Sequence, residues 1–393
     1  MKPNAPRDRT ISYLPQLKIA ALGLTLAGRV RAQTFTTLHS FTALNTNTNS
    51  DGSFPYAGIS SGNTLYGTAN AGGSSGNGTA FKVNTDGTGF TNLHNFNFSD
   101  GAYLISGLAL AGNTLYGTAA FGGSSSNGTL FKVNTDGTGF ANIYSFTATP
   151  APYYTNSDGA QPFAGLILSG NTLYGTATGG GSSDGGTVFK LNTNGTGFTN
   201  LHNFAAGSTN SSGAYTNSDG TGPVAGLILS GNTLYGTATS GSGSGNGAVF
   251  AINIDGTGFM NLHDFAAGGT NSSGVYTNGD GVGPEASRLI LSGNTLYGTA
   301  SGDGSSGSGT VFSLSLKPQL TIIRSGVPPS GVILTWPTNV AGFSYAGFTL
   351  QSTTNLFSPA AWITNSPAPV VVNGQNTVTN PISRTKRFYR LGQ

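Results

Sequence analysis

The chain has 393 residues, with 63 Gly, 17 Pro, no Cys and charged side chains at only 7% of positions. Soluble domains usually carry roughly a quarter charged residues, so an ordinary helical or α/β enzyme does not fit this composition. The absence of Cys excludes disulfides, thiolate metal sites and thiol nucleophiles. The 23 Phe and 15 Tyr supply core material, and we expect an all-β chain that is dense in turns.

The formal net charge of +3 hides an uneven distribution. Six basic residues precede residue 33, and without residues 1–32 the net charge is −2. Residues 33–318 carry 5 basic and 12 acidic side chains, whereas residues 319–393 carry 5 basic and none acidic. The basic whole-chain isoelectric point therefore does not indicate a nucleic-acid partner.

Residues 1–32 resemble a secretory signal peptide. A basic, polar stretch is followed by an apolar run at 19–28, and Val30 and Ala32 place small residues before Gln33. The run is shorter than the roughly 20 residues that span a bilayer. A buried first helix is the alternative. We predict bacterial export to the cell surface or the medium, with no transmembrane segment in the mature chain.

Five copies of the string GNTLYGTA dominate residues 33–318. Each copy is preceded by a short apolar strand and followed by a Gly/Ser-rich loop and a strand with the pattern GTxF or GAxF. In the first four copies a further strand follows, with the pattern LHxF or, once, IYSF. Gly170 and Asn171 suit a two-residue hairpin that needs positive φ at its first central residue. Four antiparallel strands per repeat match the blade of a β-propeller.

The two ends of the repeat region complement each other. The fifth repeat has no LHxF strand, while an isolated LHxF segment at residues 34–41 precedes the first repeat. If this segment completes the last blade, no sheet edge is left open. We therefore predict a five-bladed β-propeller that is closed by the N-terminal strand. An open array of five units is the alternative.

The recurring pattern DGxxPxAGLIL, GNTLYGTA, GTVFKL and LHxF resembles the GloVer tandem repeat of exported bacterial proteins, some of which carry C-terminal anchoring segments. The resemblance covers roughly residues 34–316. It implies export and a propeller-like repeat domain. It carries over no catalytic residue.

Residues 319–393 differ in composition and hold both tryptophans, Trp336 and Trp362. Short alternating runs separated by turn signals predict a small β-sandwich. The runs around Trp336 and Tyr389 resemble fibronectin type III strands. The basic group Arg384, Lys386, Arg387 and Arg390 suits either an acidic polymer or, more simply, a solvated face.

The four histidines, one in each LHxF motif, are His39, His94, His202 and His263. The equivalent position of the second repeat holds Tyr144. Because these residues lie one per blade, we interpret them as packing residues and not as metal ligands or general bases. The tyrosines of GNTLYGTA are likewise expected to fill the space between blades.

One set of acids is the candidate ligand-binding site. An Asp-Gly pair recurs in the connection that follows each LHxF motif, at Asp51, Asp100, Asp158, Asp219 and Asp280. Strand alternation places these connections beside the Gly/Ser-rich loops, on what we call the loop face. Loops on a rigid scaffold often carry binding residues.

Catalysis and metal binding have weaker support. Glu285 is the only Glu in the mature chain, so a pair of glutamates of the glycosidase kind is absent. Residues 47–52 resemble half of a calcium loop but no copy has the bidentate Glu, so turn formation explains the aspartates more simply. We predict no catalytic residue and no required cofactor, with calcium as an alternative.

These observations predict a non-enzymatic, exported repeat protein. Its loop face is expected to bind extracellular polysaccharide or a cell-surface protein. A structural or adhesive scaffold is the second hypothesis, and a polysaccharide hydrolase or lyase is the third. Five equivalent sites favour binding, because avidity grows with copy number.

Overall fold

The structure is a computed structural model. It describes residues 35–392 apart from 212, 271, 275, 286–287, 319, 326–330, 341–342, 346, 357–360, 366 and 382–385. The predicted signal peptide and Arg384 lie outside the described residues. The described part contains no helix, so none that could cross a membrane is found there.

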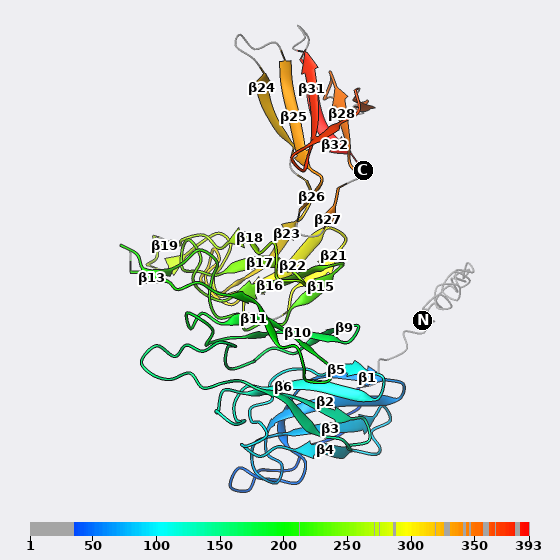
Figure 1. Ribbon diagram of the computed structural model, residues 1–393, viewed down its shortest axis with the longest axis vertical. Helices are drawn as coiled ribbons and strands as arrows, with labels where there is room; N and C mark the ends of the chain where they lie inside the picture. Colours follow the sequence, from blue (N-terminus) through cyan, green and yellow to red (C-terminus); the bar gives the residue numbers. More distant parts are fainter. Residues whose placement is uncertain are drawn as a thin grey trace, which may run out of the picture.

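Each repeat forms one antiparallel sheet, and the five sheets follow one another along the molecule (Figure 1). The first two sheets are β1(Ser53–Ser61), β2(Thr64–Ala71), β3(Thr79–Asn84) and β4(Thr91–Asn95), then β5(Ala109–Ala111), β6(Thr114–Ala119), β7(Thr129–Asn134) and β8(Ala141–Ser145). The third and fourth are β9(Ile167–Ser169), β10(Thr172–Ala177), β11(Thr187–Asn192) and β12(Thr199–Asn203), then β15(Ile228–Ser230), β16(Thr233–Ala238), β17(Ala248–Asn253) and β18(Met260–Asp264). The fifth has three strands, β21(Ile290–Ser292), β22(Thr295–Ala300) and β23(Thr310–Ser315). The all-β, antiparallel prediction is confirmed.

Local sequence explains the hairpin that opens each sheet. Gly170 has φ +57° and turns the chain so that Ser169 pairs with Thr172, as predicted. The second glycine of GNTLYGTA has a different role. A Cβ at Gly117 would lie 2.5 Å from Cζ of Phe131, whose ring lies across the neighbouring strand. Glycine at this position therefore makes room for the GTxF phenylalanine.

The first four GNTLYGTA tyrosines pack between consecutive sheets, whereas Tyr297 of the fifth repeat is 42% exposed. Tyr66 is 8% exposed and belongs to a core cluster with Leu115 and Phe131 of the second sheet. Tyr174 packs in the same way against Leu234 and its neighbours in the fourth sheet. These contacts confirm the predicted packing role.

The predicted closure of a ring is wrong for the described chain. β23 pairs only with β22, and residues 35–41 form no strand. The ring of His39 instead stacks on Phe90 of the first sheet, with centroids 3.6 Å apart. His94 stacks on Phe140 of the second sheet in the same way, at 3.4 Å. The N-terminal segment thus packs on the sheet that follows it, as each LHxF strand does, and the repeat array stays open.

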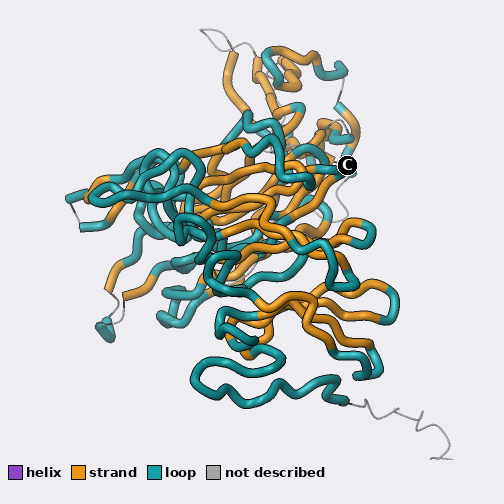
Figure 2. The backbone as a smooth tube through the Cα atoms, turned by 60° about the horizontal axis from the view of Figure 1, so that its bottom comes forward, coloured by secondary structure: helices purple, strands orange, loops and turns teal. Residues whose placement is uncertain are grey.

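The two predicted loop sets lie on one face, as Figure 2 shows for the long teal connections. Isolated bridges join them at Ala102 and Phe121, and at Ala160 and Gly179. Two connections carry small hairpins, β13(Ser208–Thr209) with β14(Tyr215–Thr216), and β19(Gly269–Thr270) with β20(Tyr276–Thr277). This arrangement confirms the predicted loop face.

The C-terminal residues form two sheets and a short hairpin. One sheet is β24(Thr321–Ser325), β25(Gly331–Pro337), β31(Gln375–Pro381) and β30(Val370–Val372), and the other is β29(Ile363–Thr364), β28(Thr349–Thr353) and β32(Phe388–Gly392). The hairpin is β26(Asn339–Val340) and β27(Phe343–Ser344). Buried Leu334 and Trp336 of β25 pack with Leu350 of β28, so the two sheets share a core. Arg390 is engaged by a ring, its guanidinium lying 4.3 Å from the Trp362 centroid.

Candidate functional site

Every candidate aspartate is bound by the aromatic residue of the preceding LHxF motif. Four histidine Nε2 atoms lie 2.7–3.0 Å from a carboxylate oxygen, in the pairs His39–Asp51, His94–Asp100, His202–Asp219 and His263–Asp280. In the remaining copy the Tyr144 hydroxyl donates to Asp158 over 2.8 Å. The carboxylate also accepts backbone N–H groups just beyond the motif, for example from Thr147 at 3.0 Å. The aspartates therefore hold the connection against the end of the LHxF segment.

Three of these aspartates are almost inaccessible. Asp51 is 5% exposed, Asp158 2% and Asp219 6%. Burial opposes ionisation of Asp51, but hydrogen bonds from Thr42 and His39 outweigh it and hold the pKa of this carboxyl below its ordinary value. The geometry favours a loop-shaping role for the five aspartates, and their ligand-binding role stays a prediction.

An asparagine two residues before the aspartate completes the arrangement, and our sequence analysis missed it. Asn156 Oδ1 accepts the N–H groups of Gly159 and Gly181, and its Nδ2 donates to the Thr147 carbonyl. One side chain thus joins both connections of the loop face. Asn49, Asn217 and Asn278 make similar contacts. The recurring Asn-x-Asp-Gly string was the signal for this network.

The described residues give no sign of a built metal centre. No group of three or more His, Asp or Glu side chains within the described part of the chain is placed to hold an ion. Asn49, part of the calcium-like segment, has its amide engaged by backbone groups at 2.6–2.9 Å. The hairpin aspartates are also engaged, since Asp86 accepts the Thr88 hydroxyl and N–H, which lower its pKa.

Exposed aromatic side chains are the second feature of the loop face. They lie in the connections that carry the aspartates or, for Phe54 and Tyr56, at the start of β1, with exposures of 44–78%, and comprise Phe54, Tyr56, Phe98, Tyr103, Tyr153, Tyr154 and Tyr215. Our sequence analysis counted these residues only as core material. Their position near the Asp-Gly pairs was the signal that separates them from the aromatics of the GNTLYGTA and GTxF strands.

Two of these aromatics hold a strained backbone. The residue three positions after the aspartate has positive φ in all five repeats, at Phe54, Tyr103, Gln161, Gly222 and Gly283. Glycine adopts this conformation freely, whereas a bulky residue there is an outlier that costs on the order of 1–3 kcal/mol. Phe54 and Tyr103 nevertheless occupy it with their rings 64% and 47% exposed. Such strain, without burial to compensate it, is typical of a functional position.

The third repeat also forms a polar cavity on this face. Its volume is about 280 Å³, and its lining includes Tyr154, Gln161, Thr178 and Asp184. The Asp184 carboxylate accepts the Gly180 N–H at 2.9 Å, which leaves its second oxygen for other donors. A ring beside amide, hydroxyl and carboxylate groups provides both a stacking surface and hydrogen-bond partners.

The family model for the Gloeobacter/Verrucomicrobia repeat matches residues 24–216. This segment belongs to that repeat family. The family assignment confirms the resemblance drawn from the GNTLYGTA and LHxF motifs. The remaining Gloeobacter/Verrucomicrobia-type motifs, through the fifth GNTLYGTA copy, extend beyond the matched segment. No curated protein matches the sequence.

Solved structures show only distant similarity. A putative TolB from Agrobacterium tumefaciens has a TM-score of 0.37 and 9% identity, over 84% of this chain and 91% of that one. A nidogen/laminin complex has a TM-score of 0.36 and 14% identity, over 64% and 75% of the two chains. YCF48 bound to D1 peptide has a TM-score of 0.31 and 13% identity, over 70% and 73%. Similarity at this level carries no argument about function.

Proposed function

We propose that this protein is an exported, non-enzymatic binding module whose loop face holds extracellular carbohydrate. The repeats act as an open, propeller-type scaffold, and the aspartates, joined in four repeats by an asparagine, fix the shape of the connections. The aspartates thus act behind the binding surface. Export rests on the predicted signal peptide.

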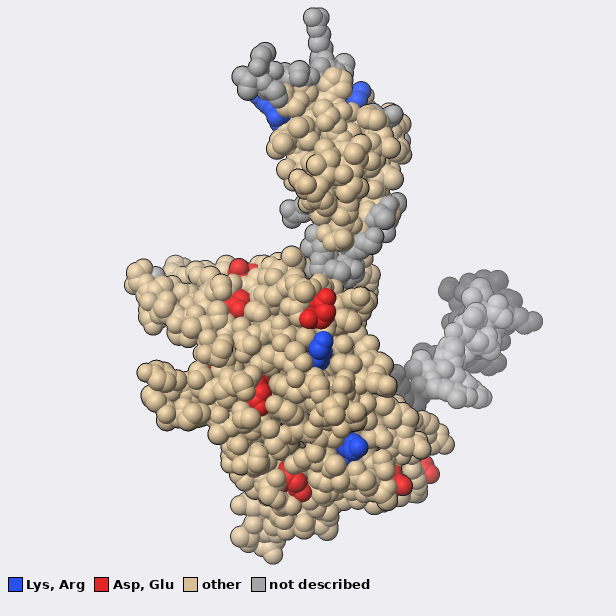
Figure 3. Space-filling model, in the orientation of Figure 1, with Lys and Arg blue, Asp and Glu red and all other residues tan. Residues whose placement is uncertain are grey.

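The observation that carries the proposal is the strained, exposed pair Phe54 and Tyr103. An exposed aromatic ring can stack on the apolar face of a sugar, and the Tyr103 hydroxyl can hydrogen-bond to a sugar hydroxyl. Figure 3 shows that one face of the molecule carries few and scattered charges, which fits a ligand recognised by rings and amides. Equivalent positions in successive repeats suit a repeating polymer, because linked sites raise avidity.

The test separates binding from stability. Replacing Tyr103 or Phe54 by Gly installs the residue that Gly222 and Gly283 already provide in later repeats. We expect each variant to be at least as stable as the wild type, because the strained φ is relieved. Each is expected to lose retardation in gels that contain neutral or acidic polysaccharides.

A matched control is Met260→Gly, which removes a side chain 39% exposed on β18, outside the connections. It should leave retardation unchanged. Retardation lost in EDTA would assign the binding to a metal-dependent site. No retardation of the wild type by any polysaccharide would contradict the carbohydrate proposal and favour the structural scaffold. Release of new reducing ends would contradict the non-enzymatic part.

A further inference from the structure

Residues in or just before the first strand of each of the five repeats border a single cavity of about 570 Å³. Four repeats contribute a glycine to its lining, namely Gly58, Gly107, Gly165 and Gly226. In the fifth repeat the residue before the equivalent leucine is Arg288, which also lines the cavity. Phe54 and Tyr103 do not line it, so this site is separate from the proposed carbohydrate surface.

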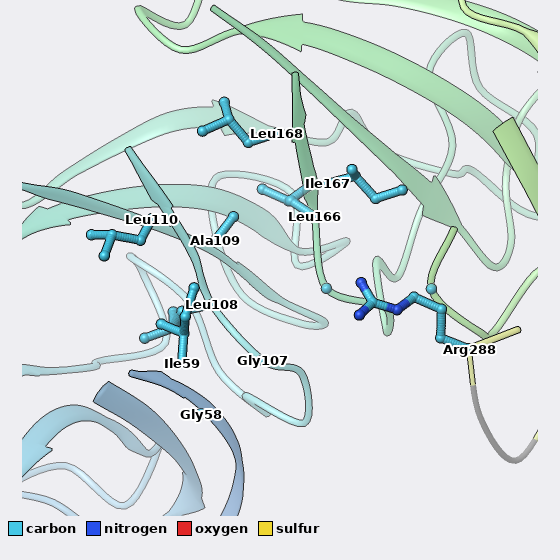
Figure 4. Close-up of a pocket in the computed structure, with 12 residues that line it drawn as sticks. Gly58, Ile59, Gly107, Leu108, Ala109, Leu110, Leu166, Ile167, Leu168 and Arg288 are labelled. Carbon is cyan, nitrogen blue, oxygen red and sulfur yellow. The ribbon is translucent and has the colours of Figure 1, made fainter. Parts of the chain in front are cut away.

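Close approach of the equivalent segments of neighbouring repeats explains the glycines. A Cβ at Gly165 would lie 3.0 Å from the Gly107 carbonyl oxygen, tighter than ordinary van der Waals contact. The last repeat has no following first strand, so a long side chain fits there. The Arg288 stem runs beside Gly226, where a Cβ would lie 3.5 Å from Arg288 Cδ. Figure 4 shows the side chain reaching toward the space from the side opposite Ile59 and Leu110.

The guanidinium of Arg288 has no protein partner among the described residues. Its side chain is exposed, and every ion pair within the described part joins a His to an Asp. Glu285, the nearest acid in sequence, bonds instead to the Ser301 hydroxyl at 3.1 Å. The rest of the lining consists of Gly, Ala, Leu and Ile. One uncompensated positive charge therefore faces a cavity whose other side chains are uncharged and apolar.

We propose that this cavity binds a small monocarboxylate with an apolar body. The planar guanidinium donates two parallel N–H groups, which match the two oxygens of a carboxylate. Ile59, Leu108 and Leu110 would contact the apolar body. A sugar would find no hydroxyl or amide side chain in this lining, and a phosphate dianion would keep one charge unpaired. The cavity volume lies within the range of small-molecule sites.

Isothermal titration calorimetry of the full chain with four probes tests the proposal. Hexanoate and N-acetyl-leucine carry the carboxylate on a linear and a branched body, and hexanamide and N-acetyl-leucinamide are their neutral partners. We expect each carboxylate to bind roughly tenfold to a hundredfold more tightly than its amide, the range of a charge-assisted pair. Preference for N-acetyl-leucine would indicate a peptide terminus, and preference for hexanoate an acyl chain.

Arg288→Gly is the decisive variant, because four repeats already hold glycine at this position. It should keep the wild-type melting temperature and lose the preference for carboxylate. Arg288→Lys should retain part of it, since the charge stays but the paired donors are lost. Equal binding of acid and amide, undiminished binding to Arg288→Gly, or no binding of either acid would each overturn the proposal. Polysaccharide retardation of Arg288→Gly should be unchanged, so failure here and failure of the carbohydrate proposal are distinguishable.

Discussion

The buried aspartates illustrate how a repeated polar residue can be structural and not ligand-binding. A carboxylate that accepts hydrogen bonds from a phenol or imidazole and from nearby backbone N–H groups has much of its acceptor capacity used by the protein. Removing the acceptor leaves buried donors unpaired, which costs more than the bond itself contributes. At this scale the hydrogen-bond partners decide the role of the residue, and the residue type alone does not.

Asp158→Ala should therefore destabilise the protein by about 1–3 kcal/mol, the cost of leaving buried donors unsatisfied. The Tyr144 hydroxyl and the Thr147 N–H are the donors that lose their acceptor. Urea denaturation measures the change in the free energy of unfolding. Asp86→Ala, in a solvent-exposed turn, is the control and should change it less. Unchanged stability together with lost ligand binding would return Asp158 to the role predicted from the sequence.

Asp51 gives the same network a pH dependence. Its pKa is held below the ordinary value of an aspartate, because hydrogen bonds from Thr42 and His39 outweigh burial. The unfolded chain then takes up a proton before the folded one, so this stability is complete above pH 4 and falls as the pH drops through the folded pKa. Thermal melts of wild type and Asp51→Asn should differ at pH 6, and the difference should shrink as the pH falls below 4. A constant difference across this range would show that the carboxylate is not ionised in the fold.

Part of this site could be predicted from the sequence. The LHxF histidines were interpreted as packing residues because they occur one per repeat, and the stacking of His39 and His94 on phenylalanine rings agrees with that role. Their pairing with the aspartates could not be predicted, because the sequence separation varies between 6 residues for His94–Asp100 and 17 for His202–Asp219. Hydrogen-bond partners brought together by loops of different length leave no fixed spacing for a motif to reveal.

At the scale of the sheets, the missing fourth strand has a measurable consequence. Val249 on β17 pairs with His263 on β18 and is fully buried. The equivalent Val311 on β23 has no such neighbour and is 83% exposed. The same residue type thus occupies the same register in two opposite environments.

We expect Val249→Ala to cost about 1.6 kcal/mol, at ~0.8 kcal/mol for each methylene-sized group removed from the core. Val311→Ala should cost a few tenths of that at most. Chemical denaturation of the two variants side by side provides the comparison. Equal losses would mean that a strand covers β23 in solution, as the closed ring requires.

The motifs correctly predicted four four-stranded sheets, the hairpin at Gly170 and the packing of the first four tyrosines. They failed on the closure of the ring. Strand count is local information, whereas closure depends on the angle between successive sheets. That angle is set by contacts such as those of Tyr66 with Leu115 and Phe131. A repeat motif names these residues but does not specify the geometry of their packing. The isolated LHxF segment therefore supplied the motif that the fifth repeat lacks, but it did not indicate which sheet the segment packs on.

At the scale of the whole molecule, one buried tyrosine links the repeat array to the C-terminal sheets. Tyr345 follows β27, is 1% exposed, and donates its hydroxyl to the Leu316 carbonyl at the end of the fifth repeat. Burial raises the pKa of Tyr345 and also that of Tyr235 in the fourth repeat, to which Tyr345 adds a smaller electrostatic contribution. A phenol in this position couples the two parts only while it keeps its proton.

Tyr345→Phe keeps the ring and removes the hydroxyl. At pH 7 the free energy of unfolding of this variant should be about 0.5–1.5 kcal/mol lower than that of the wild type. The advantage of the wild type should shrink in alkali. Because the folded pKa of Tyr345 is raised, its stabilising effect is complete below about pH 10 and is lost as the pH rises through the folded value. Differential scanning calorimetry between pH 7 and pH 11 should show the wild-type transition falling faster than that of Tyr345→Phe. Parallel curves over the whole range would place the phenol in contact with water and remove it from the junction.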